Sequence, residues 1–152
     1  MIHVTFAGHR NVFNSGAVRE RVDAAIASIL TKDMEFYFYS GGMGEFDKLC
    51  ESAVRQAKAD HKELEIKLVY VSPYMRNSFN TQRDYYEYYY DDVLIPMELA
   101  EAHYKGAITK RNRWMVDHAD YLIAYIHRDH GGAYTTLRYA ERKKTCRIIH
   151  VG

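Results

Sequence analysis

The sequence is poor in several features that mark specialised classes of protein. It holds only two cysteines, Cys50 and Cys146, and neither belongs to a CxxC pair. We therefore expect neither a disulfide scaffold nor a zinc module, and the two thiols fit a reducing compartment. No apolar run approaches the ~20 residues that a membrane-spanning helix requires, so we expect no membrane partner.

An excess of charge of one sign is also missing. The chain carries 21 Lys and Arg against 20 Asp and Glu, a formal net charge of +1. This balance gives no overall attraction to nucleic acid, so we do not expect a nucleic-acid partner, although a local basic patch remains possible. Residues 1–10 have no basic segment ahead of a long apolar run. They predict a first strand rather than a signal peptide, and with the reduced thiols a cytoplasmic protein.

The chain does contain β-rich apolar runs that alternate with segments of helical periodicity. Its 152 residues predict a single domain, residues 1–152. Strands are predicted at 2–8, 35–40, 64–74, 93–96, 120–127 and 147–151. Helices are predicted after a cap at Asn14 or Ser15, after the second strand, after Pro96, and at 110–119 and 131–144. Residues 75–92 are polar and tyrosine-rich, and we assign them to no element.

This alternation predicts an α/β fold. Strands separated by helices form right-handed βαβ crossovers, which produce a parallel sheet. The strand at 120–127 is almost continuously apolar, which is typical of a strand buried on both faces. We therefore expect a Rossmann-like three-layer sandwich, with a mostly parallel sheet covered by helices on both faces.

Three predicted strand-to-helix junctions carry the candidate site. They read AGHR (7–10), SGGMG (40–44) and HGGAYTT (130–136). Ligands of open α/β sheets bind at the carboxyl ends of strands, where the N–H groups of helix N-termini favour phosphate. The junctions therefore predict a nucleotide-phosphate site. The alternative is that the glycines serve only tight turns, since neither a GxGxxG nor a GxxxxGK[ST] motif is present.

The same residues carry a family resemblance over nearly the whole chain. The chain resembles the YpsA-like branch of the SLOG superfamily in three segments: AGHR, SGGMGEFDKLCESA, and RNRWMVDHAD followed by GGAYTT. That superfamily also includes the LOG phosphoribohydrolases and the DNA-processing protein DprA. The resemblance implies a Rossmann-like fold and a pocket for a nucleotide or nucleotide-derived ligand. The ligand-binding positions that it implies are Gly8, Arg10, Ser40, Gly41, Gly42, Gly44, Asp47, Arg111, Asn112, Arg113, Gly131, Gly132, Thr135 and Thr136.

One departure from the LOG enzymes bears on catalysis. Those enzymes carry a PGGxGTxxE motif whose glutamate is needed to cleave the N-glycosidic bond. Here His130 replaces the proline, Tyr134 a motif glycine and Arg138 the glutamate. A carboxylate stabilises the oxocarbenium-like state of such a cleavage. Its loss favours binding without hydrolysis, although Asp47, Glu51 or Glu141 could substitute.

The polar candidates each have a structural alternative. The three arginines could clamp phosphate. Alternatively, they could lie on a solvated helix face or form ion pairs with Asp117 or Asp120. Asn112 could bond the ligand or brace the loops. Asp47 could accept ribose hydroxyls or cap its own helix. The two threonines could donate to phosphate or serve only as capping and packing residues.

For the remaining residues we favour structural roles. Trp114 and Cys50 are interpreted as core residues, and His9 as a backbone-bonded side chain. The loop with His127, Asp129 and His130 lacks a fourth metal ligand, so we expect neither a metal site nor another cofactor. The tyrosines of 85–90 could stack a base, but their acidic neighbours favour packing or a subunit contact, and hence a homodimer.

The main hypothesis is a protein that binds or senses a nucleotide or nucleotide-derived small molecule. The alternative is a LOG-like nucleoside 5′-monophosphate phosphoribohydrolase, and binding of DNA as in DprA is disfavoured by the near-neutral charge.

Overall fold

The computed structural model describes residues 1–75, 78–100 and 106–152. Six strands form one parallel sheet in the order β4-β3-β2-β1-β5-β6. The strands are β1 (Ile2–Gly8), β2 (Glu35–Ser40), β3 (Glu65–Val71), β4 (Asp92–Leu94), β5 (Tyr121–Tyr125) and β6 (Arg147–His150). The chain builds outward from β1 to β4 and then returns to place β5 against the other side of β1. The strand order therefore reverses between β1 and β5, where ligands of open α/β sheets bind.

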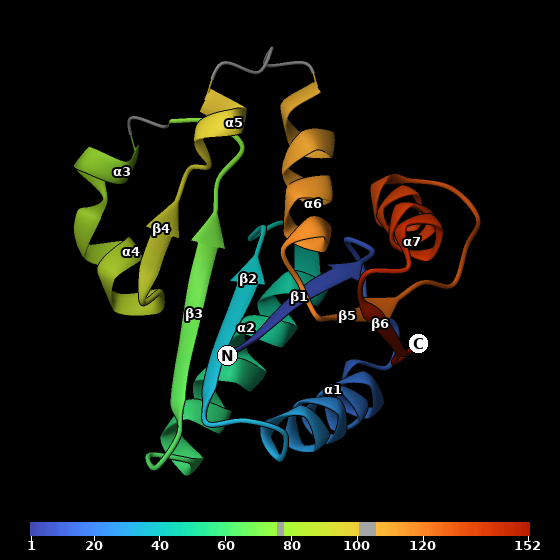
Figure 1. Ribbon diagram of the computed structural model, residues 1–152, viewed down its shortest axis with the longest axis horizontal. Helices are drawn as coiled ribbons and strands as arrows, with labels where there is room; N and C mark the ends of the chain where they lie inside the picture. Colours follow the sequence, from blue (N-terminus) through green and yellow to red (C-terminus); the bar gives the residue numbers. More distant parts are fainter. Residues whose placement is uncertain (76–77, 101–105) are drawn as a thin grey trace.

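Helices cover both faces of the sheet (Figure 1). The long helices are α1 (Ser15–Leu30), α2 (Gly44–Asp60), α6 (Ala107–Asp117) and α7 (Gly132–Lys143), and the short ones are α3 (Ser78–Thr81), α4 (Arg83–Tyr89) and α5 (Met97–Ala100). Helices α1 and α2 pack together on one face, and α6 and α7 pack together on the other. The expected three-layer α/β sandwich is confirmed.

The core is divided by the sheet. Val4 and Phe6 of β1 point into the larger cluster, which they share with the apolar stripes of α1 and α2. Ala7 of the same strand points into the smaller cluster under α6 and α7. Successive side chains of a strand alternate between the two faces, so a strand covered on both faces must be apolar at nearly every position.

The element boundaries differ from the predicted ones by a few residues. Strand β3 ends at Val71, two residues before Pro73, and α6 begins at Ala107, earlier than the predicted residue 110. Asn14 holds the N-cap position of α1, but in a left-handed conformation and without a side-chain hydrogen bond. Its expected capping role is therefore not fulfilled. Part of the tyrosine-rich segment that we left unassigned forms α3 and α4.

Among the helices that the structure describes, none combines the length and the apolar character that crossing a bilayer requires.

Substitution of Phe38 tests the packing of the larger core cluster. Its side chain is 0% exposed in β2 and stacks on Phe6 with ring centroids 6.2 Å apart. Replacing a buried Phe by Ala leaves a cavity, so we expect Phe38→Ala to lower the free energy of unfolding by about 3–5 kcal/mol. The matched control is Met34→Ala at a side chain that is 59% exposed, where we expect a change within about 0.5 kcal/mol. Urea unfolding followed by circular dichroism measures both, and a change below about 1 kcal/mol for Phe38→Ala would contradict this packing.

Candidate functional site

A cleft of about 320 Å³ opens at the carboxyl ends of β1 and β5, where the strand order reverses. Its walls come from four places in the chain: the end of β1 and the loop after it, the start of α2, the inner side of α6, and the loop from β5 into α7. Seven of the residues implied by the resemblance line it: Gly8, Arg10, Asp47, Arg111, Asn112, Gly132 and Thr136. Residues far apart in the sequence thus converge where the strand-end rule predicts.

Two glycines allow the first and second loops to approach closely. A Cβ on Gly8 would lie 2.2 Å from the ring of Phe46 in α2. Gly44 has a φ of +85°, and its added Cβ would lie 2.8 Å from the Cα of Arg10. The Glu45 N–H also donates to the Arg10 carbonyl at 2.8 Å. These glycines therefore set the distance between β1 and α2, and with it the floor of the cleft.

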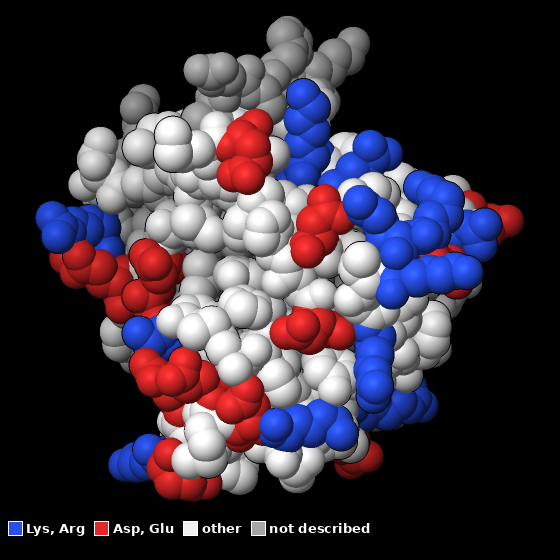
Figure 2. All heavy atoms as spheres, viewed as in Figure 1, with Lys and Arg blue, Asp and Glu red and all other residues white. Residues whose placement is uncertain are grey.

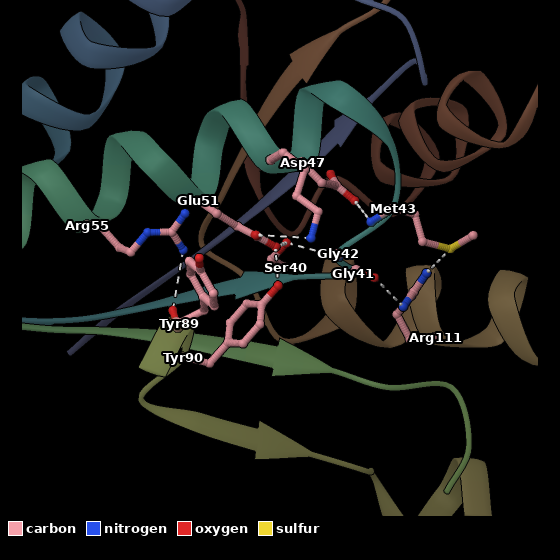
Figure 3. Close-up of polar contacts among 11 residues, drawn as sticks. Ser40, Gly41, Gly42, Met43, Asp47, Glu51, Arg55, Tyr89, Tyr90 and Arg111 are labelled. Carbon is pink, nitrogen blue, oxygen red and sulfur yellow. Dashed lines mark hydrogen bonds and ion pairs between the residues drawn. The ribbon is translucent and has the colours of Figure 1, made fainter. Parts of the chain in front are cut away.

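The loop 41–43 offers fewer free donors than we expected from its sequence. The Gly42 N–H donates to Ser40 Oγ at 3.1 Å, and the Met43 N–H donates to Asp47 Oδ2 at 2.9 Å (Figure 3). Since these N–H groups already have acceptors within the protein, the loop is not a cradle of open donors. Ser40 is 1% exposed and does not line the cleft, and Gly42, with a φ of +64°, packs against Tyr70.

The N-terminus of helix α2 carries two acids, each of which accepts a backbone hydrogen bond. Glu45 and Asp47 both lie in its first turn. Asp47 accepts the N–H of the N-cap residue Met43, and Glu45 Oε2 accepts the N–H of Val12 at 2.7 Å. The capping alternative for Asp47 is therefore confirmed. Two carboxyl groups in this first turn make the α2 end of the cleft unfavourable for a phosphate.

Asp47 is the one acidic side chain among the described residues that line the cleft, and it is only 9% exposed. Burial raises its pKa to about 7, although the hydrogen bond from Met43 and the charge of Arg111 lower it. Near neutral pH the group is thus divided between its neutral and charged forms. No described residue donates a hydrogen bond to its second carboxyl oxygen. A ligand could therefore exchange both a hydrogen bond and a proton with it.

Helix α7 presents an N-terminus of the opposite character. Its first turn contains no acid, and its N-cap residue Gly131 has a φ of +96° and no side chain to cap the helix. Within the described ranges, nothing accepts a hydrogen bond from the N–H of Gly132, Ala133 or Tyr134. Gly132 and Ala133 line the cleft. These open donors, together with the helix dipole, form the most favourable position for an anion.

The threonines of α7 bond their own helix. Thr135 Oγ1 donates to the Gly131 carbonyl at 3.0 Å, and Thr136 Oγ1 donates to the Gly132 carbonyl at 2.9 Å. Both hydroxyls thus donate to the carbonyl four residues earlier, so neither threonine caps a free N–H of the helix. Thr136 borders the cleft, whereas Thr135 borders a smaller adjoining hollow with Arg113.

The arginines of the site fall into two groups. Arg111 is 2% exposed, and its guanidinium donates to the carbonyl of Gly41 at 3.2 Å and to that of Val71 at 2.9 Å. It also donates to Asn112 Oδ1 at 2.9 Å, so Asn112 braces the same group. Arg10 is exposed at the mouth of the cleft, and Arg113 lies on the surface over the ring of Tyr139. Arg10 is thus better placed than Arg111 or Arg113 to meet an incoming anion.

The sequence reasoning did not assign Arg128, Met43, Ile108 or Met115 to the site, yet all four line the cleft. Arg128 could have been found, since it lies in the loop after β5, three residues before the second Gly-Gly pair. The apolar side chains carry no comparable signal, because a methionine or isoleucine on an amphipathic helix indicates core packing.

His9 also lines the cleft, but it is 3% exposed and its Nε2 accepts the backbone N–H of His127 at 3.2 Å. Its backbone-bonded interpretation is confirmed. Burial, followed by the charge of Arg128, lowers the pKa of His9, which agrees with an acceptor nitrogen.

Other candidates lie away from the cleft. Trp114 is half-buried and packs edge-on against Tyr39 at the border of a core cluster, and Cys50 is buried as expected. The tyrosines of 85–90 do not line the cleft, and three of them are exposed at 44%, 80% and 38%: Tyr85, Tyr88 and Tyr89. Over the ranges 1–75, 78–100 and 106–152, no group of three or more His, Cys, Asp or Glu is placed to hold a metal ion.

Comparison with known proteins relates this chain to others by fold alone. No protein-family model matches the sequence, and no curated protein sequence does either. Among solved structures, DNA processing protein A (DprA) from Streptococcus pneumoniae is similar, with a TM-score of 0.63 and 14% identity over 98% of this chain and 50% of that one. DprA from Helicobacter pylori is similar with a TM-score of 0.62 and 15% identity, over 98% of this chain and 64% of that one. This chain therefore spans about half of the first protein and under two thirds of the second.

One expectation needs correction in view of these structures. The Helicobacter pylori structure describes a single-stranded DNA binding mode of DprA. A fold shared with a DNA-binding protein overturns the expectation that nucleic acid is not a partner, which depended on the near-neutral net charge and on the acidic neighbours of the tyrosines at 85–90. The narrower resemblance to the YpsA-like branch, and the relation to LOG enzymes, remain predictions. The chain shares its fold with the part of each DprA protein that it covers.

Proposed function

We propose that the cleft binds a nucleotide or nucleotide-derived small molecule. The observation that carries this proposal is the pair of unlike helix N-termini on one cleft. Helix α7 offers open N–H groups and no acid, whereas α2 offers the buried carboxyl group of Asp47. A ligand that matches both is anionic at one end and carries hydrogen-bond donors at the other, as a nucleotide does with its phosphate, sugar hydroxyls and base.

The charges around the cleft favour a single orientation of such a ligand. Arg128 lies beside the α7 end, since its guanidinium is 3.8 Å from a Cβ built on Gly131, whereas Arg10 lines the cleft from its contact with the start of α2. A phosphate at α7 therefore meets a guanidinium group as well as backbone donors. A phosphate at the α2 end would instead face Asp47 and Glu45. The proposed orientation therefore places the phosphate at α7 and a sugar or base donor at Asp47.

Hydrolysis is less well supported than binding. Arg138, at the position of the LOG glutamate, is exposed and paired with Glu141 at 3.3 Å, and neither lines the cleft. An N-glycosidase would have to use Asp47, the one carboxyl group among the described lining residues, which already accepts the Met43 N–H.

Arg10 gives the first test of small-molecule binding. Calorimetry and thermal shift against AMP, cyclic AMP, ADP-ribose and NAD should identify at least one ligand, and assay of free base in the same samples tests hydrolysis. We expect Arg10→Ala to weaken binding about 10- to 100-fold, because a charge-assisted hydrogen bond contributes about 1.5–3 kcal/mol. Arg142→Ala is the matched control, since Arg142 is exposed in the last turn of α7, away from the cleft. Absence of any thermal shift across the panel would refute the proposal.

The pH dependence of ligand affinity gives a second test, which concerns the role of Asp47. A sugar or base donor bonds best to the charged carboxylate, so ligand binding should release a proton from a group whose pKa is about 7. The affinity for ADP-ribose, whose pyrophosphate does not titrate in this range, should rise several-fold between pH 6 and pH 8. Calorimetry should show no such rise for Asp47→Asn. An affinity that is independent of pH, or that falls as the pH rises, would show that the Asp47 carboxylate does not accept a hydrogen bond from the ligand.

Single-stranded DNA is the second candidate ligand. The fold is shared with a DprA protein described as binding it, and Lys and Arg side chains gather over α6 and α7 beside the cleft (Figure 2). Arg113 and Lys143 flank the ring of Tyr139 there, at 5.1 and 5.8 Å from its centroid. Basic groups interleaved with an aromatic ring suit a single strand, whose phosphates and bases both need partners.

The salt dependence of binding tests this second candidate. In fluorescence anisotropy with a labelled oligothymidylate, we expect the double variant Arg113→Ala, Lys143→Ala to bind more weakly. The slope of log affinity against log salt should also become shallower by about 1.4, since each lost phosphate contact accounts for about 0.7. Arg83→Ala on α4 is the control. No binding by the wild-type protein at low salt would exclude this candidate. Lys143→Ala would separate the two ligands, because Lys143 does not line the cleft and only DNA binding should weaken.

A further inference from the structure

We propose that Glu51 is a positioning residue of the cleft, and that with Ser40 and Tyr90 it holds the loop 41–43 in its binding conformation. This inference rests on the proposed function, because the loop matters only if the cleft binds a ligand. Glu51 itself does not line the cleft, so it would act through the loop.

The contacts form a continuous chain from α2 to the loop (Figure 3). Ser40 Oγ donates to Glu51 Oε2 at 2.6 Å, and the Tyr90 hydroxyl donates to the same oxygen at 2.9 Å. Ser40 Oγ in turn accepts the N–H of Gly42 at 3.1 Å. The hydroxyl of Ser40 can donate to only one acceptor, and Glu51 takes that bond, which leaves a lone pair directed at Gly42.

Burying the carboxyl group of Glu51 costs free energy, which its contacts must offset. Glu51 is 1% exposed in the middle of α2, and Lys48 is 3.9 Å from its second oxygen. A buried carboxyl group lowers stability unless hydrogen bonds compensate, and an apolar residue would serve packing better. The two donated hydrogen bonds explain how Glu51 is tolerated. The fixed loop conformation explains what the arrangement achieves.

Tyr90 donates a hydrogen bond to Glu51, and its ring packs beside the loop 41–43. Burial, followed by the charge of Glu51 and the hydrogen bond to it, raises the pKa of Tyr90, so its hydroxyl stays protonated and donates. The Tyr90 and Tyr70 rings lie 5.3 Å apart and close the space beside Gly42. A Cβ on Gly42 would lie 2.5 Å from Tyr70 and 3.5 Å from the Tyr90 oxygen. The tyrosine-rich segment thus touches the loop although it does not reach the cleft.

The loop is held from the opposite side by Arg111. That guanidinium donates to the Gly41 carbonyl at 3.2 Å, and a Cβ on Gly41 would lie 2.8 Å from it. Gly41 and Gly42 are therefore fixed between α6 on one side and the group of Glu51, Ser40 and Tyr90 on the other. Met43, the next residue, lines the cleft and donates its N–H to Asp47. A displaced loop would therefore move both the wall and the carboxyl group that we propose as the ligand's partner.

Hydrogen exchange at the Gly42 amide, followed by NMR, tests the loop-holding step without any ligand. We expect Ser40→Ala and Glu51→Ala to accelerate this exchange about tenfold or more, and Tyr90→Phe several-fold. Glu51→Gln, whose amide oxygen can still accept both bonds, should stay within about twofold of the wild type. Tyr89→Phe is the matched control on the same segment. If Glu51→Ala does not fold, Tyr90→Phe decides, and unchanged exchange in the folded variants overturns the proposal.

Affinity for ADP-ribose, measured by calorimetry, tests the functional step. The variants with accelerated exchange should bind at least fivefold more weakly, whereas Glu51→Gln and Tyr89→Phe should bind as the wild type does. Accelerated exchange with unchanged affinity would make the contacts merely structural and would overturn the positioning role. If the wild-type protein binds no ADP-ribose, the small-molecule proposal loses its support here, and the exchange experiment alone decides whether Glu51 holds the loop.

Discussion

The buried guanidinium of Arg111 is the contact on which the geometry of the cleft depends. It joins α6 to the carbonyl at the end of β3 and to that of the glycine after β2. Carbonyls at the carboxyl ends of strands have no further strand to pair with, so a buried donor must satisfy them. One side chain thereby sets the distance between α6 and the sheet. The width of the cleft between α6 and its other walls therefore depends on Arg111.

A second constraint is electrostatic. Parallel strands direct the N-termini of the following helices to the same edge of the sheet, so their dipoles add unless something opposes them. In this chain the acids of α2 oppose its dipole, while α7 has none in its first turn. The cleft is therefore polarised, with a positive end at α7 and a titratable carboxyl group at α2. That polarity is the physical basis of the proposal that the ligand has two unlike ends.

The sequence predicted the α/β class, the layers and the edge of the sheet where the cleft lies, because these follow from periodicity and from glycine at strand ends. It could not assign partners to polar groups. Gly42 was predicted to bind the ligand, but Ser40 accepts its N–H, and Asp47 accepts the N–H of the neighbouring Met43. Arg111 was predicted to meet phosphate, yet its guanidinium bonds backbone carbonyls of distant loops. Such pairings depend on tertiary distances that no local pattern encodes.

The expectation that nucleic acid is not a partner was wrong for a related reason. A net charge of +1 is a sum over 21 basic and 20 acidic residues, and it contains nothing about where they lie. The fold gathers Lys and Arg over α6 and α7, so one face attracts anions although the whole molecule is nearly neutral (Figure 2). Screening limits each charge to about 8–10 Å at physiological salt, so a ligand senses the local patch rather than the total. The distribution of charge over the fold, and not its sum, decides which anions the cleft and its surroundings can attract.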